Sequence, residues 1–228
     1  MKHIILLLTA VLFSWFLPSN ALATHISGGE ITYEHLGNDS FLITLTLYRD
    51  CSGAGLGNVN RDVDISSSCT GTSTLSMALQ NPGGTEVSQI CPAQIGNSTC
   101  NGGAISGMEK YTYTGITQLI TNCADYTFSY DQFARNDNEN LTGGINTWGI
   151  LVDATLNSVL YPNNSSPEYT ADPIPYVCQN QAVNYNYGVV ENDGDSLSYE
   201  LIAARQAPTR PGGSTINYVA GFTPAAPI

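Results

Sequence analysis

Hydrophobic and polar residues alternate along residues 41–48, where every second side chain from Phe41 to Leu47 is apolar and the others are mostly Thr and Tyr. A period of two places successive side chains on opposite faces of a sheet, so this pattern predicts a half-buried β-strand. Residues 30–34 alternate in the same way, and the Gly-Asn-Asp-Ser sequence between the two runs is typical of a tight turn. We therefore expect a β-hairpin here.

The same alternation recurs in shorter segments of the chain. These are residues 111–114, 126–130, 148–152, 183–187 and 196–202. After the N-terminal stretch, no segment shows the sustained period of about 3.6 residues that an amphipathic helix requires. The predicted fold class is all-β, with short strands separated by Gly, Asn and Pro turns as in a β-sandwich.

Two stretches interrupt this pattern. Residues 52–107 are dominated by Gly, Ser, Asn and Thr, which predicts long loops with a few short strands. Prolines recur through residues 162–175 and resist both helix and central strand, so we expect a domain boundary near residue 171. Residues 24–171 would then form a disulfide-stapled, β-sandwich-like domain. Residues 172–228 would begin a second β domain that is too short here for a full sandwich and is expected to be truncated.

The first 23 residues have the features of a secretory signal peptide. Lys2 provides a positive start, residues 4–17 are nearly continuously apolar, and Ala-Leu-Ala at residues 21–23 offers a cleavage site between small residues. The apolar run is about 14 residues long, whereas a membrane-spanning helix needs roughly 20. The protein is therefore predicted to be exported to the cell surface or the extracellular space, without membrane insertion after cleavage.

Charge is sparse and mostly negative. Charged residues make up 11% of the chain, and 7 Lys and Arg against 19 Asp and Glu give a net charge of −12 at pH 7. Such a surface repels phosphates, which argues against nucleic acid and anionic membranes as partners. The uncharged polar residues that dominate instead can hydrogen-bond glycans or proteins with little charge selectivity.

The predicted mature chain contains an even number of cysteines, which predicts three disulfides in an oxidising compartment. The six are Cys51, Cys69, Cys91, Cys100, Cys123 and Cys178. Their pairing is left open by the sequence, although the short stretch between Cys91 and Cys100 could close a loop. A zinc site is the competing interpretation, but Cys-x-x-Cys pairs are absent and the predicted mature chain offers only His25 and His35 as histidine ligands.

An acidic turn at residues 191–196 is the segment most similar to a binding site. Glu191, Asp193 and Asp195 surround a glycine there, and like charges this close are costly unless a cation neutralises them. Calcium accepts many oxygen ligands in flexible geometry, so these three residues are candidate calcium ligands. Their spacing differs from that of an EF-hand loop. The alternative is a solvated hairpin turn, because Asp-Gly favours a turn by itself.

Other groups of side chains have both a binding and a structural interpretation. Arg135 lies among the acids of residues 131–140, and Arg49 directly precedes Asp50. Each arginine could belong to a ligand-binding loop, but an ion pair within the protein is the favoured interpretation. The tyrosine-rich runs at residues 111–113 and 126–130 could stack on sugar rings, but positions within a sheet core are favoured. The sequence has no nucleophile elbow, paired-histidine zinc motif or phosphate-binding loop, and the chain is predicted not to be an enzyme.

Several of these segments carry a resemblance to a known family. Residues 24–33 read Thr-His-Ile-Ser-Gly-Gly-Glu-Ile-Thr-Tyr and lead into Leu-Thr-Leu-Tyr-Arg-Asp-Cys at residues 45–51. Both resemble the N-terminal region of large, type IX-secreted surface proteins of Bacteroidota that carry gliding-motility-associated C-terminal domains or PKD domains. Residues 175–201, with Asp-Gly-Asp-Ser-Leu-Ser-Tyr, resemble the Ig-, cadherin- or PKD-like domain that follows. Residues 134–136 are similar to an Arg-Asn element between the two.

This resemblance implies a non-enzymatic extracellular module of a large secreted or cell-surface protein. Its expected role is adhesion or recognition, with an unidentified glycan or protein as ligand. The alternative is a secreted, glycan-active hydrolase with accessory β domains, because a pair of catalytic carboxylates could be drawn from the many acids of the chain. Tandem β repeats in the parent reading frame would favour recognition, and a catalytic domain there would favour the hydrolase.

Overall fold

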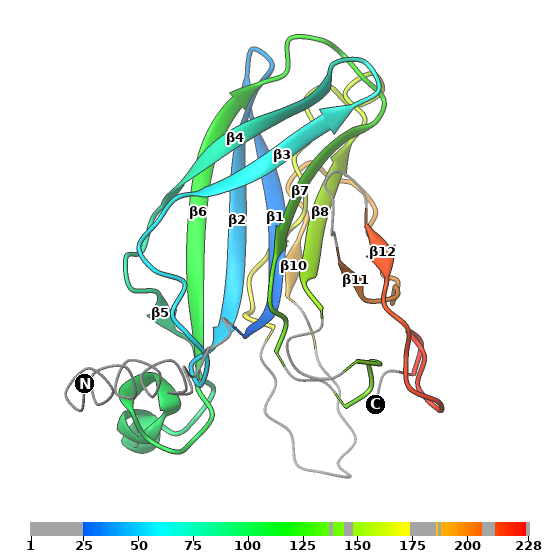
Figure 1. Cartoon of the computed structure of the whole chain (residues 1–228). Helices are drawn as coiled ribbons and strands as arrows, with labels where there is room; N and C mark the ends of the chain where they lie inside the picture. The colour runs from blue at the N-terminus through cyan, green and yellow to red at the C-terminus, as the bar shows by residue number, and fades with distance from the viewer. Residues whose placement is uncertain are drawn as a thin grey trace, which may run out of the picture.

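The fold is almost entirely β in the computed structural model of this chain (Figure 1), which confirms the predicted all-β class. The structure describes residues 25–136, 139–143, 148–173, 186, 188–206 and 213–226. The predicted signal peptide at residues 1–23, Cys178 and most of the predicted strand at residues 183–187 lie outside this part. Within the described residues, no helix is long and apolar enough to cross a membrane.

Strands β1 (Ile26–Gly37) and β2 (Ser40–Asp50) form the predicted hairpin. Asn38 and Asp39 connect them with φ angles of 51° and 58°, a left-handed conformation that these residue types tolerate in tight turns. Every second residue of β2 from Phe41 to Leu47 is fully buried. The alternation in the sequence therefore identified the core-facing side of the strand.

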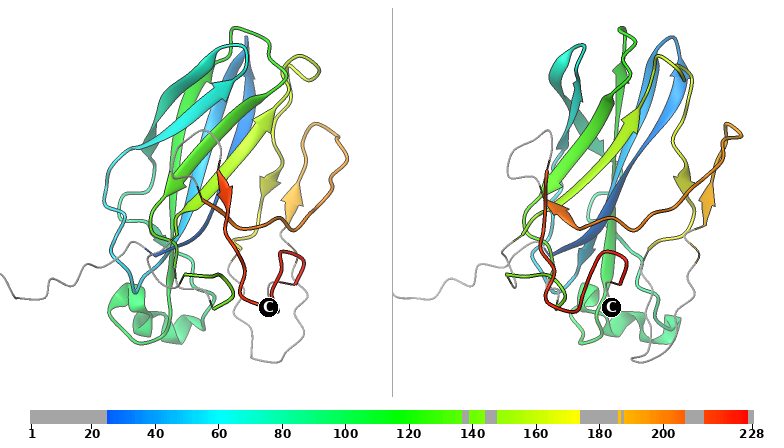
Figure 2. Two further views of the ribbon diagram at one scale, coloured as in Figure 1. Left: turned by 45° about the vertical axis from the view of Figure 1, so that its right-hand side comes forward. Right: turned by 90° about the vertical axis from the view of Figure 1, so that its right-hand side faces the viewer.

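Five longer strands and one short one complete an antiparallel sheet with this hairpin. They are β3 (Arg61–Ser67), β4 (Gly71–Leu79), β5 (Thr85–Glu86), β6 (Met108–Gln118), β7 (Tyr126–Gln132) and β8 (Ile150–Leu156). The order is β1-β2-β6-β4-β3-β7-β8, with β5 beside β6. Only Ala78 and Leu79 of β4 pair with β6, whereas residues 71–77 of β4 pair with β3. The sheet thus bends at β4 into two layers, as Figures 1 and 2 show.

The core lies between these two layers. Tyr111, Tyr113, Tyr126, Phe128 and Tyr130 are all buried in it, which confirms the core interpretation of the tyrosine-rich runs over sugar stacking. The rings of Tyr33 on β1 and Phe128 on β7 join the layers with centroids 5.6 Å apart. Gly29 allows a close approach of β1 to its neighbours, since a Cβ there would lie 2.9 Å from the carbonyl oxygen of Thr46.

Two expectations about local structure need correction. Residues 52–107 contain the expected loops and a few strands, but β3 and β4 are regular strands of 7 and 9 residues, and the short 3-10 helices η1 (Pro92–Asn97) and η2 (Thr99–Asn101) lie there as well. Outward-facing Ser, Thr and Asp hid their alternation, while Val63 and Met77 are fully buried. Residues 196–202 form no strand, because no described strand lies beside them, and Tyr199 remains 69% exposed.

After β8 the chain passes around the side of the sandwich where β1 and β8 lie (Figure 2). Strand β9 (Glu168–Tyr169) pairs with β10 (Val189–Val190), and β11 (Arg205–Gln206) pairs with β12 (Ser214–Thr215). Arg205 forms an ion pair with Asp153 of β8. The boundary near residue 171 and the Ig-, cadherin- or PKD-like character of residues 172–228 remain predictions.

Candidate recognition surface

Four connections between strands meet at one end of the sandwich, which we name the tip (Figure 1). They are the β1–β2 turn at residues 38–39, the β3–β4 turn at residues 68–70, the β6–β7 loop at residues 119–125 and the start of the β8–β9 connection at residues 157–164. Antiparallel strands return every second connection to the same end of a sheet. The tip therefore gathers residues that are far apart in the sequence.

A disulfide ties the β3–β4 turn to the β6–β7 loop. It joins Cys69 and Cys123, which are 54 residues apart in the chain. Beside it, the carboxylate of Asp125 accepts hydrogen bonds from the backbone N–H of Ser68 at 3.2 Å and from the Ser68 hydroxyl at 3.1 Å. These two connections are thus fixed to each other by a covalent bond and by hydrogen bonds.

The other two connections are tied to the β6–β7 loop by hydrogen bonds. The backbone N–H of Cys123 donates to the hydroxyl of the buried Ser158 at 2.9 Å, and the backbone N–H of Ser158 donates back to the Cys123 carbonyl at 3.0 Å. In the β1–β2 turn, the carbonyl of Asp39 accepts from the N–H of Leu119 at 2.8 Å. All four connections are therefore cross-linked, and a surface fixed in this way loses little entropy on binding.

Large apolar side chains are exposed in and beside these connections. Their exposed fractions are 48% for Leu36, 63% for Ile116, 80% for Ile120, 55% for Val159, 66% for Leu160 and 58% for Tyr161. The tip connections contain the acids Asp39 and Asp125 but no Lys or Arg. Exposed apolar side chains on connections that are fixed to one another suit a site that binds a partner.

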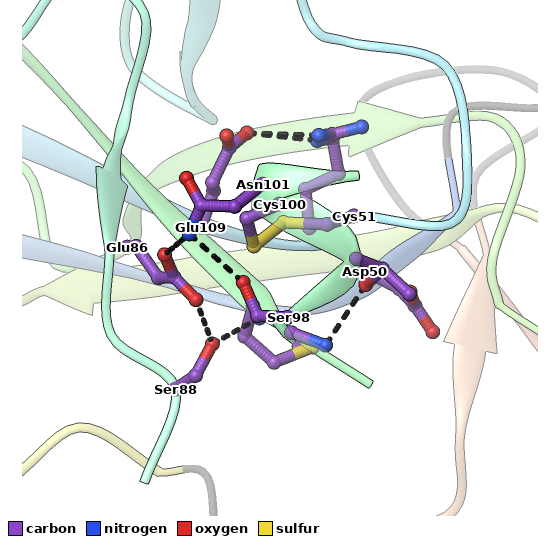
Figure 3. The surroundings of a disulfide bond; sticks show 12 residues. Asp50, Cys51, Glu86, Ser88, Ser98, Cys100, Asn101 and Glu109 are labelled. Carbon is purple, nitrogen blue, oxygen red and sulfur yellow. Dashed lines mark hydrogen bonds and ion pairs between the residues drawn. A yellow bond between two sulfur atoms is a disulfide. The ribbon is translucent and has the colours of Figure 1, made fainter. Parts of the chain in front are cut away.

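The opposite end, the base, is held by a second disulfide between Cys51 and Cys100 (Figure 3). The expectation that Cys91 and Cys100 close a short loop is therefore wrong. Two residues before Cys51, Arg49 of β2 forms a 2.9 Å ion pair with Glu109 of β6, and both are largely buried. The interpretation of Arg49 as internally ion-paired is confirmed.

The polar side chains around the base are mutually satisfied (Figure 3). Glu86 accepts hydrogen bonds from the hydroxyl of Ser88 at 2.9 Å and from the side-chain amide of Asn101 at 2.8 Å. Burial, and next the carboxylate of Glu109, raises the pKa of Tyr111 to about 12, so that its hydroxyl stays a hydrogen-bond donor to Glu109. These contacts indicate that the base has a structural role.

The predicted calcium ligands divide into two groups in the structure. Glu191 accepts hydrogen bonds from the backbone N–H groups of Asp193 at 3.1 Å and Asp195 at 2.7 Å, so it stabilises its own turn. Asp193 and Asp195 instead line a cavity of about 310 Å³ together with residues 161–164. Asp193 also accepts a hydrogen bond from the N–H of Ser165 at 2.5 Å.

These contacts leave the calcium site a prediction. Among the described residues, two groups of three metal-ligating side chains lie within 4.8 Å of one another, and both consist of disulfide-bonded cysteines with Glu109 or Asp125. The acidic turn forms no such group. Calcium binding there would require carbonyl or asparagine oxygens from residues 161–164 in addition to the carboxylates of Asp193 and Asp195.

Arg135 has a structural role that its sequence context did not predict. Its guanidinium donates hydrogen bonds to the carbonyl of Gly149 at 3.2 Å and to the carbonyl of Arg205 at 3.1 Å. Burial lowers the pKa of this side chain. Arg135 thus joins the residues after β7 to the start of β8 and to β11, and the acids around it in the sequence gave no sign of these carbonyl partners.

Comparisons of the chain with family models, with curated proteins and with solved structures find no match. The tip is thus defined by the geometry of this chain alone. Sequence reasoning missed it because Ile116, Ile120 and Leu160 have the residue types of a core. The only local signal was that Cys69 and Cys123 lie in polar, loop-forming segments.

Proposed function

We propose that this chain is a non-enzymatic recognition module of a secreted or cell-surface protein and that the tip binds its partner. The observation that carries this proposal is the cross-linking of four connections into one surface on which aliphatic side chains are exposed. The two disulfides suit an oxidising environment outside the cytoplasm. The resemblance to Bacteroidota surface proteins supports the same location.

The chemistry of the tip favours a protein partner over a glycan. Sugar rings are commonly bound by aromatic rings with the help of polar groups, but Tyr161 is the only aromatic residue among the exposed apolar side chains of the tip. Ile120 and Leu160, the most exposed of these side chains, are suited to an apolar patch on another protein. The net charge of −12 makes an acidic partner unfavourable.

A binding screen with the purified mature chain tests this function. The protein would be applied to a glycan array and to an array of extracellular proteins, each at several concentrations. We expect saturable binding to a small set of proteins and no loss of array glycans with time. Hydrolysis of array glycans would contradict the proposal in favour of a hydrolase, and the absence of saturable binding on both arrays would also contradict it.

A further inference from the structure

The tip is continuous with a segment that leads down the sandwich toward the base. This segment, residues 165–172, follows the exposed tip residues 159–161 and includes β9. We name it the strap. It is attached to the sandwich near both of its ends, and each attachment involves well-defined hydrogen bonds or an ion pair.

The upper attachment lies along the outer edge of β1. The backbone N–H of Tyr33 donates to the hydroxyl of Ser166 at 2.8 Å, and the N–H of Ser166 donates to the carbonyl of Tyr33 at 2.8 Å. The N–H of His35 donates to the hydroxyl of Ser165 at 3.2 Å. The strap thereby provides hydrogen-bond partners for backbone groups on the outer edge of β1, where no further strand of the sheet lies.

The lower attachment lies on the outer face of β2 and β6. Asp172 accepts hydrogen bonds from Nζ of Lys110 at 2.9 Å and from the hydroxyl of Tyr48 at 3.3 Å. Tyr48 and Lys110 are direct neighbours in the sheet. Glu30 of β1 lies beside this group, and the charges of both Lys110 and Asp172 act on it.

The strap is a short connection between these two attachments. Tyr33 pairs with Ile43, and Tyr48 lies five residues further along β2, which is about 17 Å along the strand. Only residues 167–171 lie between Ser166 and Asp172, and β9 within them pairs with β10. A change at one attachment is therefore transmitted to the other through a few residues.

We propose that the strap couples the lower part of the sandwich to the tip. Release of Asp172 from Lys110 and Tyr48 allows the strap to move, weakens the hydrogen bonds of Ser165 and Ser166 to the edge of β1, and loosens the tip at residues 159–161. The importance of this coupling rests on the proposed function, but the coupling itself needs no partner.

Amide hydrogen exchange of the full mature chain, without any partner, tests the coupling. The variant is Asp172→Asn, which removes the ion pair, and the matched control is Glu168→Gln, which removes the same charge from an exposed position in the strap. We expect Asp172→Asn to speed exchange about threefold at the amides of Tyr33, Ser166 and Tyr161, as the loss of a half-exposed ion pair implies. The control should leave all three at the wild-type rate.

Two results would overturn the proposal. Faster exchange confined to residues 170–172 would show that the two attachments are independent, and unchanged exchange throughout would show that Asp172 does not hold the strap. A second variant, Lys110→Gln, removes the same ion pair from the side of the sheet and must reproduce the pattern of Asp172→Asn. Because no partner is used, these outcomes are separate from the success or failure of the binding screen.

Discussion

Glu30 is an acid on the outer face of the sheet, where Tyr48, Lys110 and Asp172 surround it. Burial raises the pKa of its carboxyl, the charge of Lys110 opposes that shift and the charge of Asp172 adds to it. A raised pKa means that the folded protein favours the protonated carboxyl over the ionised one. The ionised form of Glu30 therefore opposes folding at neutral pH.

We predict that Glu30→Gln raises the stability of the protein relative to wild type at pH 7 and that this advantage shrinks toward pH 4. The stability due to protonated Glu30 is fully present below its ordinary pKa of 4.5 and is lost as the pH rises through the raised value. Thermal unfolding of both proteins between pH 4 and 7 measures the difference. Glu34→Gln, at an exposed position of the same strand, is the control, and a Glu30→Gln effect independent of pH would contradict the prediction.

Cys91 is exposed, and the structure places it in neither of the two disulfides. Cys178 lies outside the described residues, so the third of the predicted disulfides is untested. We predict that it joins Cys91 to Cys178, because these are the two cysteines that remain and exported proteins rarely keep exposed thiols. Mass spectrometry of unreduced peptides should find this pair. A Cys91 that is alkylated without prior reduction would refute it.

At the scale of elements, alternation predicted the strands whose outward residues differ clearly from their inward ones, such as the β1–β2 hairpin and β7. It failed for β3 and β4, whose Ser- and Thr-rich outer faces resemble loop sequence. It also failed at residues 196–202, because a strand needs a neighbour that the local sequence does not encode. The tip could not be predicted for the same reason, since the pairing of Cys69 with Cys123 depends on β3 lying beside β7 in the sheet.

The Cys69–Cys123 disulfide should carry much of the rigidity of the tip. Closing a loop of this length is expected to stabilise the protein by about 4 kcal/mol through the entropy of the unfolded chain. Replacing both cysteines with Ala should therefore lower the free energy of unfolding by up to about that amount, as measured by urea unfolding. It should also speed amide exchange at residues 119–125, whereas removing Cys51 and Cys100 should speed exchange at the base and not there. Equal exchange at the tip in both variants would contradict this role.

The acidic turn gives a prediction at the same scale. If calcium binds between the turn and residues 161–164, millimolar calcium should raise the unfolding temperature of the wild-type chain, because a ligand of the folded state stabilises it. Asp195→Ala should abolish this rise, and Glu191→Ala should retain part of it, because Glu191 hydrogen-bonds its own turn. An unfolding temperature that does not respond to calcium would exclude the site.

At the scale of the whole molecule, the two disulfides hold opposite ends of the sandwich. Cys51–Cys100 closes a base in which the polar groups satisfy one another, and Cys69–Cys123 closes a tip that leaves aliphatic side chains exposed. The net charge of −12 disfavours contact between copies of the chain and leaves these apolar residues available to another partner. This asymmetry between the ends is the physical basis for assigning recognition to the tip.

The most direct test of this account compares the binding of two variants to the array proteins that capture the wild-type chain. The first, Ile120→Ser with Leu160→Ser, alters the tip, and the second, Ile202→Ser, alters an aliphatic side chain that is 60% exposed away from the tip. We predict that the tip variant loses at least tenfold in affinity, equivalent to about 1.4 kcal/mol, while its unfolding temperature and the binding of the control variant stay at the wild-type values. A tip variant that binds as tightly as wild type would contradict the account.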